Sequence, residues 1–322
     1  MATKVKQEPS PVTGSLDRFR GDVEWSSSDF IRAHNEVVSS GRYNFEGSKI
    51  PIPTSIRYDR LEEALGPVIT PKEARTLKLL EFGFPLGCKP DFGCTKRPDN
   101  HHSATSFKEA INQYLATAAE SQSILGPFEQ SPIAGLCYSP LMSVPKEETK
   151  RRVIVDFSFP PGSSVNDGIS SSTYLDKAIL FSLPSVQSMV SRINELGTGC
   201  LLYKRDLKGA FRQFSIDPGD YRLAGLHWLG MSYVDTRLAM GLRNAAYCCQ
   251  AVTEMVAKIA GKHGHVLVYL DDFGGAELSG KANDTFMLLG SLLTHFGLEE
   301  ALGKAVAPTK KMDLLNICFD TI

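Results

Sequence analysis

Two adjacent aspartates follow an apolar run near the end of the chain. Asp271 and Asp272 come directly after the segment 265–270, and an aromatic residue and two glycines follow them. The pattern predicts a buried strand that turns sharply, with the acids at the turn and Gly274 and Gly275 letting the chain reverse. Carboxylates at the end of an apolar strand are costly unless they are paired or bind a metal. Taken alone, the pattern favours aspartates that merely face water in a hairpin turn.

A third aspartate shifts that balance toward a metal site. Asp206 ends a second strand-like run, residues 200–206. One carboxylate from one strand and two from a neighbouring hairpin suit hard divalent cations, because Mg²⁺ is held by a few carboxylates together with substrate phosphates. Two such ions, about 3.5–4 Å apart, activate the attacking oxygen and stabilise the leaving oxygen in phosphoryl transfer. The residues permit this chemistry with Mg²⁺ or Mn²⁺.

The composition is that of an ordinary globular protein. With 322 residues, 42% of them hydrophobic and 22% charged, the chain can form one large domain or two. A net charge of −1 gives no general attraction to nucleic acid. Two basic clusters stand out locally, and a solvated surface is the simpler interpretation of each: Lys146, Lys150, Arg151 and Arg152; and Lys204, Arg205, Lys208 and Arg212.

The cysteines and the hydropathy of the sequence limit the cellular compartments in which the protein is expected. The seven scattered cysteines fit a reduced, intracellular protein, with no signal that separates nucleus from cytoplasm. Cys88 and Cys94, followed by His101 and His102, could be drawn as a zinc site, but their spacing matches no common zinc finger. The sequence contains no apolar run that is long enough to span a bilayer, so we expect no membrane partner.

Helical patterns and hairpins alternate along the chain. The polar residues 1–15 are expected to be disordered, and residues 1–100 to form an N-terminal extension that is only partly folded against residues 101–322. A hairpin with basic residues is predicted from 139–146 and 151–157. The main helices are predicted at 71–82, 106–124, 243–260 and 283–296. This interleaving predicts an α+β fold rather than a doubly wound parallel sheet.

The order of the motifs resembles that of reverse transcriptases, the RNA-directed DNA polymerases. The basic hairpin is followed by DLKGAF at 206–211, LAMGLRNA at 238–245 and YLDD at 269–272. Three palm motifs in this order, together with the hairpin, are a specific signal, whereas Tyr-x-Asp-Asp alone is weak. The Met-Gly form of the second motif, with segments 156–158 and 161–168, is similar to retrotransposons of the DIRS (tyrosine-recombinase) group.

The resemblance implies the fingers and palm of a right-hand polymerase, with an antiparallel palm sheet packed on helices, from about residue 100 to Ile322. Because the chain ends there, the thumb is expected to be absent or truncated. The RNase H and recombinase of the same element would lie downstream if the gene is complete. The implied reaction is attack of a primer 3′-hydroxyl on a deoxynucleoside triphosphate, directed by an RNA or DNA template and assisted by two Mg²⁺ ions.

The resemblance also implies roles for individual residues. Asp206 and Asp271 would bind both metals, with Asp272 assisting. The implied substrate contacts are Lys146 and Arg152 to the triphosphate, Phe211 as an aromatic gate that excludes a 2′-hydroxyl, Gly241 for close backbone approach to nucleotide or template, and Lys304 as a proton donor to pyrophosphate. The simpler interpretations are a solvated hairpin for Lys146, a core position for Phe211 and a helix-start glycine for Gly241.

Two departures from the family pattern leave other functions open. Ala246 stands where many relatives have proline, and Asn316 replaces a glycine of the primer grip, so primer handling is in question. The main alternative is a catalytically inactive or domesticated relic that binds nucleic acid. A second alternative, an unrelated α+β metabolic enzyme with a chance Asp-Asp turn, leaves the ordered motifs unexplained.

Overall fold

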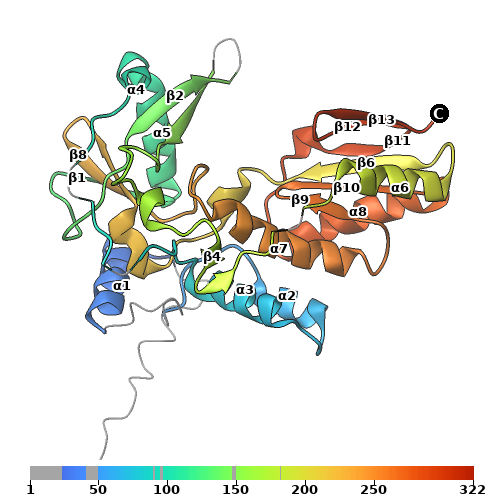
Figure 1. The fold of residues 1–322 in the computed structure, drawn as a ribbon, viewed down its shortest axis with the longest axis horizontal. Helices are drawn as coiled ribbons and strands as arrows, with labels where there is room; N and C mark the ends of the chain where they lie inside the picture. Colours follow the sequence, from blue (N-terminus) through green and yellow to red (C-terminus); the bar gives the residue numbers. More distant parts are fainter. Residues whose placement is uncertain (1–23, 41–49, 90, 95–96, 147–149, 182) are drawn as a thin grey trace, which may run out of the picture.

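The computed structural model describes residues 24–40, 50–89, 91–94, 97–146, 150–181 and 183–322. The expected disorder of residues 1–15 lies outside these ranges. The protein has an α+β fold, as predicted, and its antiparallel strands are covered by helices (Figure 1).

A four-stranded antiparallel sheet forms the frame of the C-terminal half, with the strand order β11–β6–β10–β9. Helix α6 (Val186–Leu196) and helix α8 (Ser279–His295) both pack on it (Figure 1). The strands are β6 (Leu201–Asp206), β9 (Leu267–Tyr269), β10 (Asp272–Glu277) and β11 (Val306–Thr309).

The two faces of this sheet differ because side chains alternate along each strand. On β6, Leu202 packs in one cluster with Met189 of helix α6. The ring of Tyr203 and the guanidinium of Arg205 instead contact Phe286 of helix α8. The α6 face therefore carries the even-numbered residues of β6, which end in an aspartate, and the α8 face carries the odd-numbered ones.

Four smaller sheets complete the strand framework. A three-stranded antiparallel sheet has the order β1–β8–β7, and the other three sheets are two-stranded hairpins. Their strands are β1 (Ile124–Phe128), β7 (Gly225–Trp228), β8 (Met231–Asp235), β2 (Leu141–Pro145), β3 (Arg151–Val155), β4 (Thr173–Tyr174), β5 (Lys177–Ala178), β12 (Lys311–Leu314) and β13 (Ile317–Asp320).

The remaining helices pack around these sheets. They are α1 (Ser27–Ser39), α2 (Tyr58–Leu65), α3 (Pro71–Phe82), α4 (His102–Ser106), α5 (Lys108–Glu120) and α7 (Ala245–Ala260), with short 3₁₀ helices η2 (Val165–Gly168), η3 (Ala210–Gln213), η4 (Pro218–Leu223) and η5 (Leu302–Lys304). Helix α7 contacts α2, α3, α8 and β9, so it links the N-terminal helices to the four-stranded sheet.

The described part of residues 1–100 shares the main hydrophobic core. Phe30, Leu61 and Leu77 are buried in the same cluster as Ile111 and Val252. Apolar helix faces from the first hundred residues therefore pack against elements of the later chain. The division of the protein at residue 100 stays a prediction.

The predicted helices are present, with boundaries set by local chemistry. Helix α3 matches its prediction to the residue, because Thr70 and Glu73 form a capping box, Pro71 begins the first turn and Gly83 follows the last. The helix predicted at 106–124 ends at Glu120 instead, because residues 121–123 form a turn that leads into strand β1 at Ile124.

The turn that carries the adjacent acids differs from the prediction. The chain reverses at Leu270 and Asp271, between β9 and β10, and Leu270 adopts a left-handed conformation with φ +56°. Gly274 and Gly275 lie inside strand β10, so the expectation that they let the chain reverse is wrong. A Cβ at Gly275 would lie 2.2 Å from the carbonyl oxygen of His265, so this glycine allows close backbone packing.

Candidate active site

The three predicted acids lie together at one end of the four-stranded sheet. Asp206 ends β6 and is the direct cross-strand partner of Asp272, which begins β10. Side chains of such partners in an antiparallel pair project from the same face of the sheet. Asp271 precedes Asp272 in the turn, and its carbonyl oxygen accepts a hydrogen bond from the backbone of Leu207 at 3.1 Å.

Two lysines compensate these carboxylates in part. The ammonium of Lys304, in η5, lies 2.8 Å and 3.0 Å from the two carboxylate oxygens of Asp206. This hydrogen bond raises the pKa of Lys304, while 63% of its side chain stays exposed. Lys204 lies two residues before Asp206 on β6, on the same face of the sheet, with its ammonium 4.0 Å from Oδ1 of Asp272. Lys304, predicted from its motif, is therefore placed directly on an acid of the site.

The two acids of the turn carry negative charge that the described residues do not fully compensate. Burial raises the pKa of Asp271, and the neighbouring charge of Asp206 adds to the effect. Burial, together with the neighbouring carboxylates, raises the pKa of Asp272 to about 6. Within the part of the chain that the structure describes, the enclosed Oδ1 of Asp272 has no hydrogen-bond partner. A cation from outside the chain would relieve this arrangement.

The donor set fits a hard divalent cation in kind, since carboxylate oxygens are the ligands that Mg²⁺ and Mn²⁺ accept. However, the described residues contain no group of three His, Cys, Asp or Glu side chains gathered closely enough to hold a metal ion. At Asp206 the ammonium of Lys304 contacts both carboxylate oxygens. Metal binding would therefore require that Lys304 give up this carboxylate.

The cysteines and histidines that could be drawn as a zinc site do not form one among the described residues. The backbone N–H of Cys94 donates to the sulfur of Cys137 at 2.9 Å. His101 instead pairs with Asp156 at 3.0 Å, and His102 contacts Ser106. These side chains serve separate local structures.

The basic hairpin is present as β2 and β3, and its basic side chains do not all face the same way. Arg152 is exposed, whereas Arg151 turns inward, donates to the hydroxyl and carbonyl of Ser143, and lies 3.5 Å from the ring centroid of Phe107. Lys146 is exposed at the end of β2. Arg151 therefore stabilises the hairpin and lines the same cleft as Lys146, whereas the exposed Arg152 is not among the residues that line this cleft.

Two clefts connect the hairpin with the segment after Asp206. The first, of about 730 Å³, is lined by Lys146, Lys150 and Arg151 of the hairpin and by Arg212 of η3. The second, of about 670 Å³, shares Arg212 and extends to Lys208. In the first cleft Arg212 pairs with Asp235 at 2.6 Å, and Glu109 adds another acid. Cationic side chains nevertheless outnumber acidic ones along its walls.

Phe211 and Gly241 occupy positions compatible with their predicted roles. Phe211 is half-buried in η3 and packs partly on the main core, so the structure accommodates both the gate and the core interpretation. Gly241 has φ +100° and is exposed in the turn before helix α7, which begins four residues later. This conformation favours glycine. The helix-start interpretation is therefore replaced by a turn.

Two residues that sequence reasoning gave no role hold the motifs in place. Asn166 donates to the carbonyl of Gly241 at 2.8 Å and accepts from the backbone of Arg243 at 2.9 Å. Gln250 bonds to the backbone of Val268 and Leu270, next to the acidic turn. A lone amide in an apolar stretch of helix was the only available signal for Gln250.

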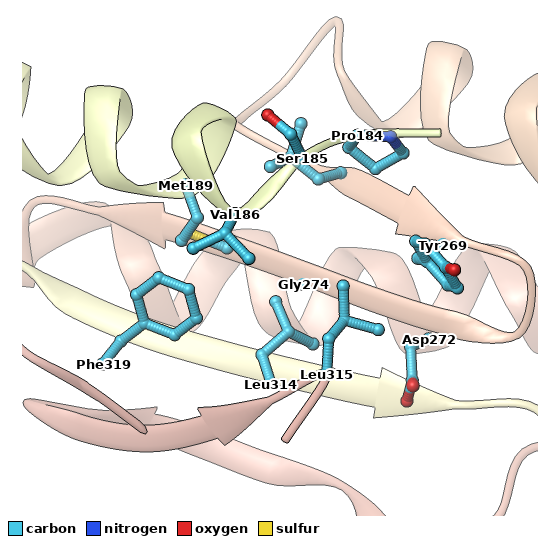
Figure 2. A pocket seen from close by; sticks show the side chains of 11 residues that line it. Pro184, Ser185, Val186, Met189, Tyr269, Asp272, Gly274, Leu314, Leu315 and Phe319 are labelled. Carbon is cyan, nitrogen blue, oxygen red and sulfur yellow. The ribbon is translucent and has the colours of Figure 1, made fainter. Parts of the chain in front are cut away.

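A small apolar pocket lies beside the acids, between helix α6, the β9–β10 hairpin and the β12–β13 hairpin (Figure 2). Leu314, Leu315, Tyr269 and Asp272 all line this pocket, and Leu315 lies on the side of Leu314 that is nearer to Asp272 in this view. Leu315 and Asn316 form the turn of the β12–β13 hairpin with φ +53° and +62°. Asparagine tolerates this left-handed conformation, so Asn316 can replace the glycine expected there.

Comparison with known proteins shows the fold. No family model matches the chain, and no curated protein matches it. The native prototype foamy virus protease–reverse transcriptase matches with 21% identity and a TM-score of 0.52, over 71% of this chain and 28% of that one. The foamy viral protease–reverse transcriptase with dsDNA matches with 16% identity and a TM-score of 0.54, over 84% of this chain and 56% of that one.

A third match is the same viral protein with an RNA/DNA hybrid, at 17% identity and a TM-score of 0.53, over 82% of this chain and 35% of that one. The chain thus spans between 28% and 56% of the length of these proteins. None of the helices in the described ranges is long and apolar enough to cross a membrane. The protein has an α+β fold similar to the fingers and palm of reverse transcriptases.

Proposed function

We propose that this chain is the fingers and palm of an RNA-directed DNA polymerase, which transfers a nucleotide from a dNTP to a primer 3′-hydroxyl. The observation that carries the proposal is the meeting of Asp206, Asp271 and Asp272 at one end of the sheet, on a fold similar to that of reverse transcriptases. A chance Asp-Asp turn would not place a third carboxylate opposite it on the neighbouring strand.

In the proposed mechanism, Asp206 and Asp271 would hold two Mg²⁺ ions, and Asp272 would assist. When bound, the ions activate the attacking oxygen and stabilise the leaving pyrophosphate. Lys146 and Arg152 bind the triphosphate through charge-assisted hydrogen bonds. Phe211 limits the space beneath the sugar, and the turn at Gly241 admits nucleotide or template. Lys304, once released from Asp206, donates a proton to the departing pyrophosphate.

The proposed partners are dNTP and an RNA or DNA template with its primer. The cationic clefts between the hairpin and Lys208 support a ligand that is rich in phosphate. Solved structures with a similar fold contain dsDNA or an RNA/DNA hybrid. Template–primer affinity should therefore fall steeply with salt, although the net charge of the chain is only −1.

We further propose that the chain comes from a retrotransposon of the DIRS type. Its support is the Met-Gly pair, Met240 and Gly241, in the second motif, together with segments 156–158 and 161–168. An RNase H and a recombinase of the same element would then be further partners, and the protein would act inside the cell, in the nucleus or the cytoplasm.

An inactive or domesticated relic that binds nucleic acid is the second candidate. The contact between Lys304 and Asp206 favours it, since this ion pair occupies a carboxylate that catalysis requires. In that case the clefts would bind template–primer, and added metal would change neither the binding nor the nucleic acid.

Primer extension separates the two candidates. We expect the wild-type protein to extend a DNA primer on RNA and DNA templates with Mg²⁺ or Mn²⁺, and EDTA to abolish this activity. Asp271→Asn should remove nearly all incorporation while the melting temperature stays at or above that of the wild type. Extension by Asp271→Asn at the wild-type rate would contradict the catalytic assignment, and binding without extension by either protein would favour the relic.

A further inference from the structure

A single buried side chain forms hydrogen bonds with the backbone just before the turn at Leu270 and Asp271. Gln250 lies on helix α7 with only 2% of its surface exposed. Its carboxamide oxygen accepts from the backbone N–H of Leu270 at 2.7 Å, and its nitrogen donates to the carbonyl of Val268 at 3.1 Å. The two contacts bracket Tyr269, the last residue of β9.

Leu270, whose N–H bonds to Gln250, has an unfavourable backbone conformation. Leu270 adopts φ +56°, in a two-residue turn whose left-handed position is usually glycine or asparagine. A side chain in this region costs about 1 kcal/mol or more unless its surroundings hold it there. Because β9 ends at Tyr269, the N–H of Leu270 lies beyond the strand ladder, and Gln250 supplies its acceptor.

The placement of Asp271 depends on this conformation. Asp271 follows Leu270 directly, and on its other side the chain is fixed by the bond from Leu207 to the Asp271 carbonyl and by the pairing of Asp272 with Asp206. The turn is therefore held by β6 after Leu270 and by helix α7 before it. Without the α7 contact, Leu270 can relax toward negative φ and carry Asp271 with it.

Packing alone does not explain why an amide side chain stands at position 250. Its neighbours on helix α7, Cys249, Ala251 and Val252, are apolar and buried. A buried amide that fails to form its hydrogen bonds costs about 1–3 kcal/mol, so an aliphatic side chain would be the safer choice for a core position. The third contact of Gln250 is with Glu254, 3.3 Å away on its own helix.

We infer that Gln250 is a positioning residue of the polymerase site, which holds Leu270 in its left-handed conformation and thereby aims the carboxylate of Asp271. The inference rests on the proposed function for its kinetic consequence. Its structural consequence, a turn held by Gln250, can be measured whether or not the protein is active.

The test compares Gln250→Met with Thr253→Val. Methionine keeps the length and approximate volume of glutamine but loses both contacts with the turn. Thr253 provides a matched control, because it is also fully buried on helix α7 and its hydroxyl bonds only to the helix carbonyls of Cys249 and Gln250. Both variants remove a buried polar group, and Gln250→Met alone releases the turn.

Amide hydrogen exchange of the segment 267–273 is the first readout. The Leu270 amide should exchange about tenfold faster or more in Gln250→Met, as expected when a buried hydrogen bond is lost. Thr253→Val should leave it within twofold of the wild type. Unchanged exchange in Gln250→Met overturns the inference, even if primer extension fails for the wild type and the proposed function falls.

Single-nucleotide incorporation is the second readout. We expect kcat to fall about 100-fold in Gln250→Met, because small misplacements of a catalytic group have effects of this size, with KM for dNTP within threefold. Thr253→Val should keep kcat within twofold. Adding Leu270→Gly should recover part of the lost kcat, since glycine adopts the turn without support. Equal kcat losses in both single variants would reduce Gln250 to a structural role.

Discussion

Two neighbouring residues of strand β6, Arg205 and Asp206, carry charges that are neutralised in different ways on the two faces of the sheet. Arg205 faces helix α8, where its guanidinium lies 2.7 Å from Glu300, stacks on Phe286 and donates to the Phe286 carbonyl at 2.9 Å. Both members of this pair are less than 10% exposed. Asp206 faces the other way, toward Asp272 and the exposed Lys304.

The difference separates charges that find their partners within the fold from charges that the described residues compensate only in part. The Arg205–Glu300 pair finds its partners within the chain, which is what a buried ion pair needs to avoid destabilising the protein. The carboxylates on the opposite face repel one another, and burial raises the pKa of Asp271 and Asp272. Carboxylates with raised pKa values are common at functional sites.

The largest expected effect comes from breaking the structural pair. Glu300→Gln leaves the guanidinium of Arg205 buried without its counter-charge, so unfolding free energy should fall by about 3–5 kcal/mol in urea titrations. Glu299→Gln is the matched control, because the Lys208–Glu299 pair is mostly exposed, at 70% and 65% of its side chains. A loss below about 1 kcal/mol for Glu300→Gln would remove the contrast between the faces.

On the face of the sheet that carries Asp206 and Asp272, we expect a substitution to raise the free energy of unfolding instead of lowering it. Asp272→Asn removes an ionised carboxylate whose pKa is raised to about 6, so in EDTA at pH 7 the variant should be more stable than the wild type by about 1–2 kcal/mol. The same urea titration measures it. A destabilisation as large as that of Glu300→Gln would show that Asp272, too, is a structural charge.

Phe211 tests whether the distinction between residues that stabilise the fold and residues that contact a ligand extends to an uncharged side chain. If its ring lies beneath the sugar, Phe211→Ala should narrow the preference for dNTP over rNTP by about tenfold or more, with little loss of stability. If it is a core residue, truncation should cost about 3–5 kcal/mol and leave sugar choice unchanged. Paired incorporation assays and a thermal melt on the same variant decide between the two.

The smallest effect is expected in the hairpin, where the contrast recurs between Arg151 and Arg152. Arg152→Ala should raise KM for dNTP about fivefold, as expected for one exposed charge contact, and leave the melting temperature unchanged. Arg151→Ala should instead lower the melting temperature, because it loses its contacts with Ser143 and Phe107. If both variants changed KM alone, Arg151 would have to be reassigned to the ligand.

Sequence reasoning predicted the parts of the site that local pattern determines. The acids, the hairpin and helix α3 follow from strand alternation, turn residues and capping, all of which are read within a few positions. It was wrong about Gly274 and Gly275, because composition alone does not distinguish a turn glycine from one that allows close packing. The contact of Lys304 with Asp206 joins residues 98 positions apart and depends on tertiary structure.

Gln250 was missed for the same reason. Its partners lie 18 and 20 positions away, on a strand and turn whose approach to helix α7 no local pattern encodes. Asn166 belongs to a segment that was noted only for its resemblance to a family, and its contacts with the second motif lie 75 and 77 positions away.

Iron-directed cleavage offers a direct view of the proposed metal site. Fe²⁺ enters carboxylate sites built for Mg²⁺ and, with ascorbate and peroxide, generates radicals that cut the backbone near the bound ion. We expect cuts in β6 close to Asp206 and in the turn close to Asp271, suppressed by excess Mg²⁺ and lost in Asp206→Asn. Cuts elsewhere only, or cuts at these strands that persist in Asp206→Asn, would contradict the claim that these carboxylates hold a divalent metal.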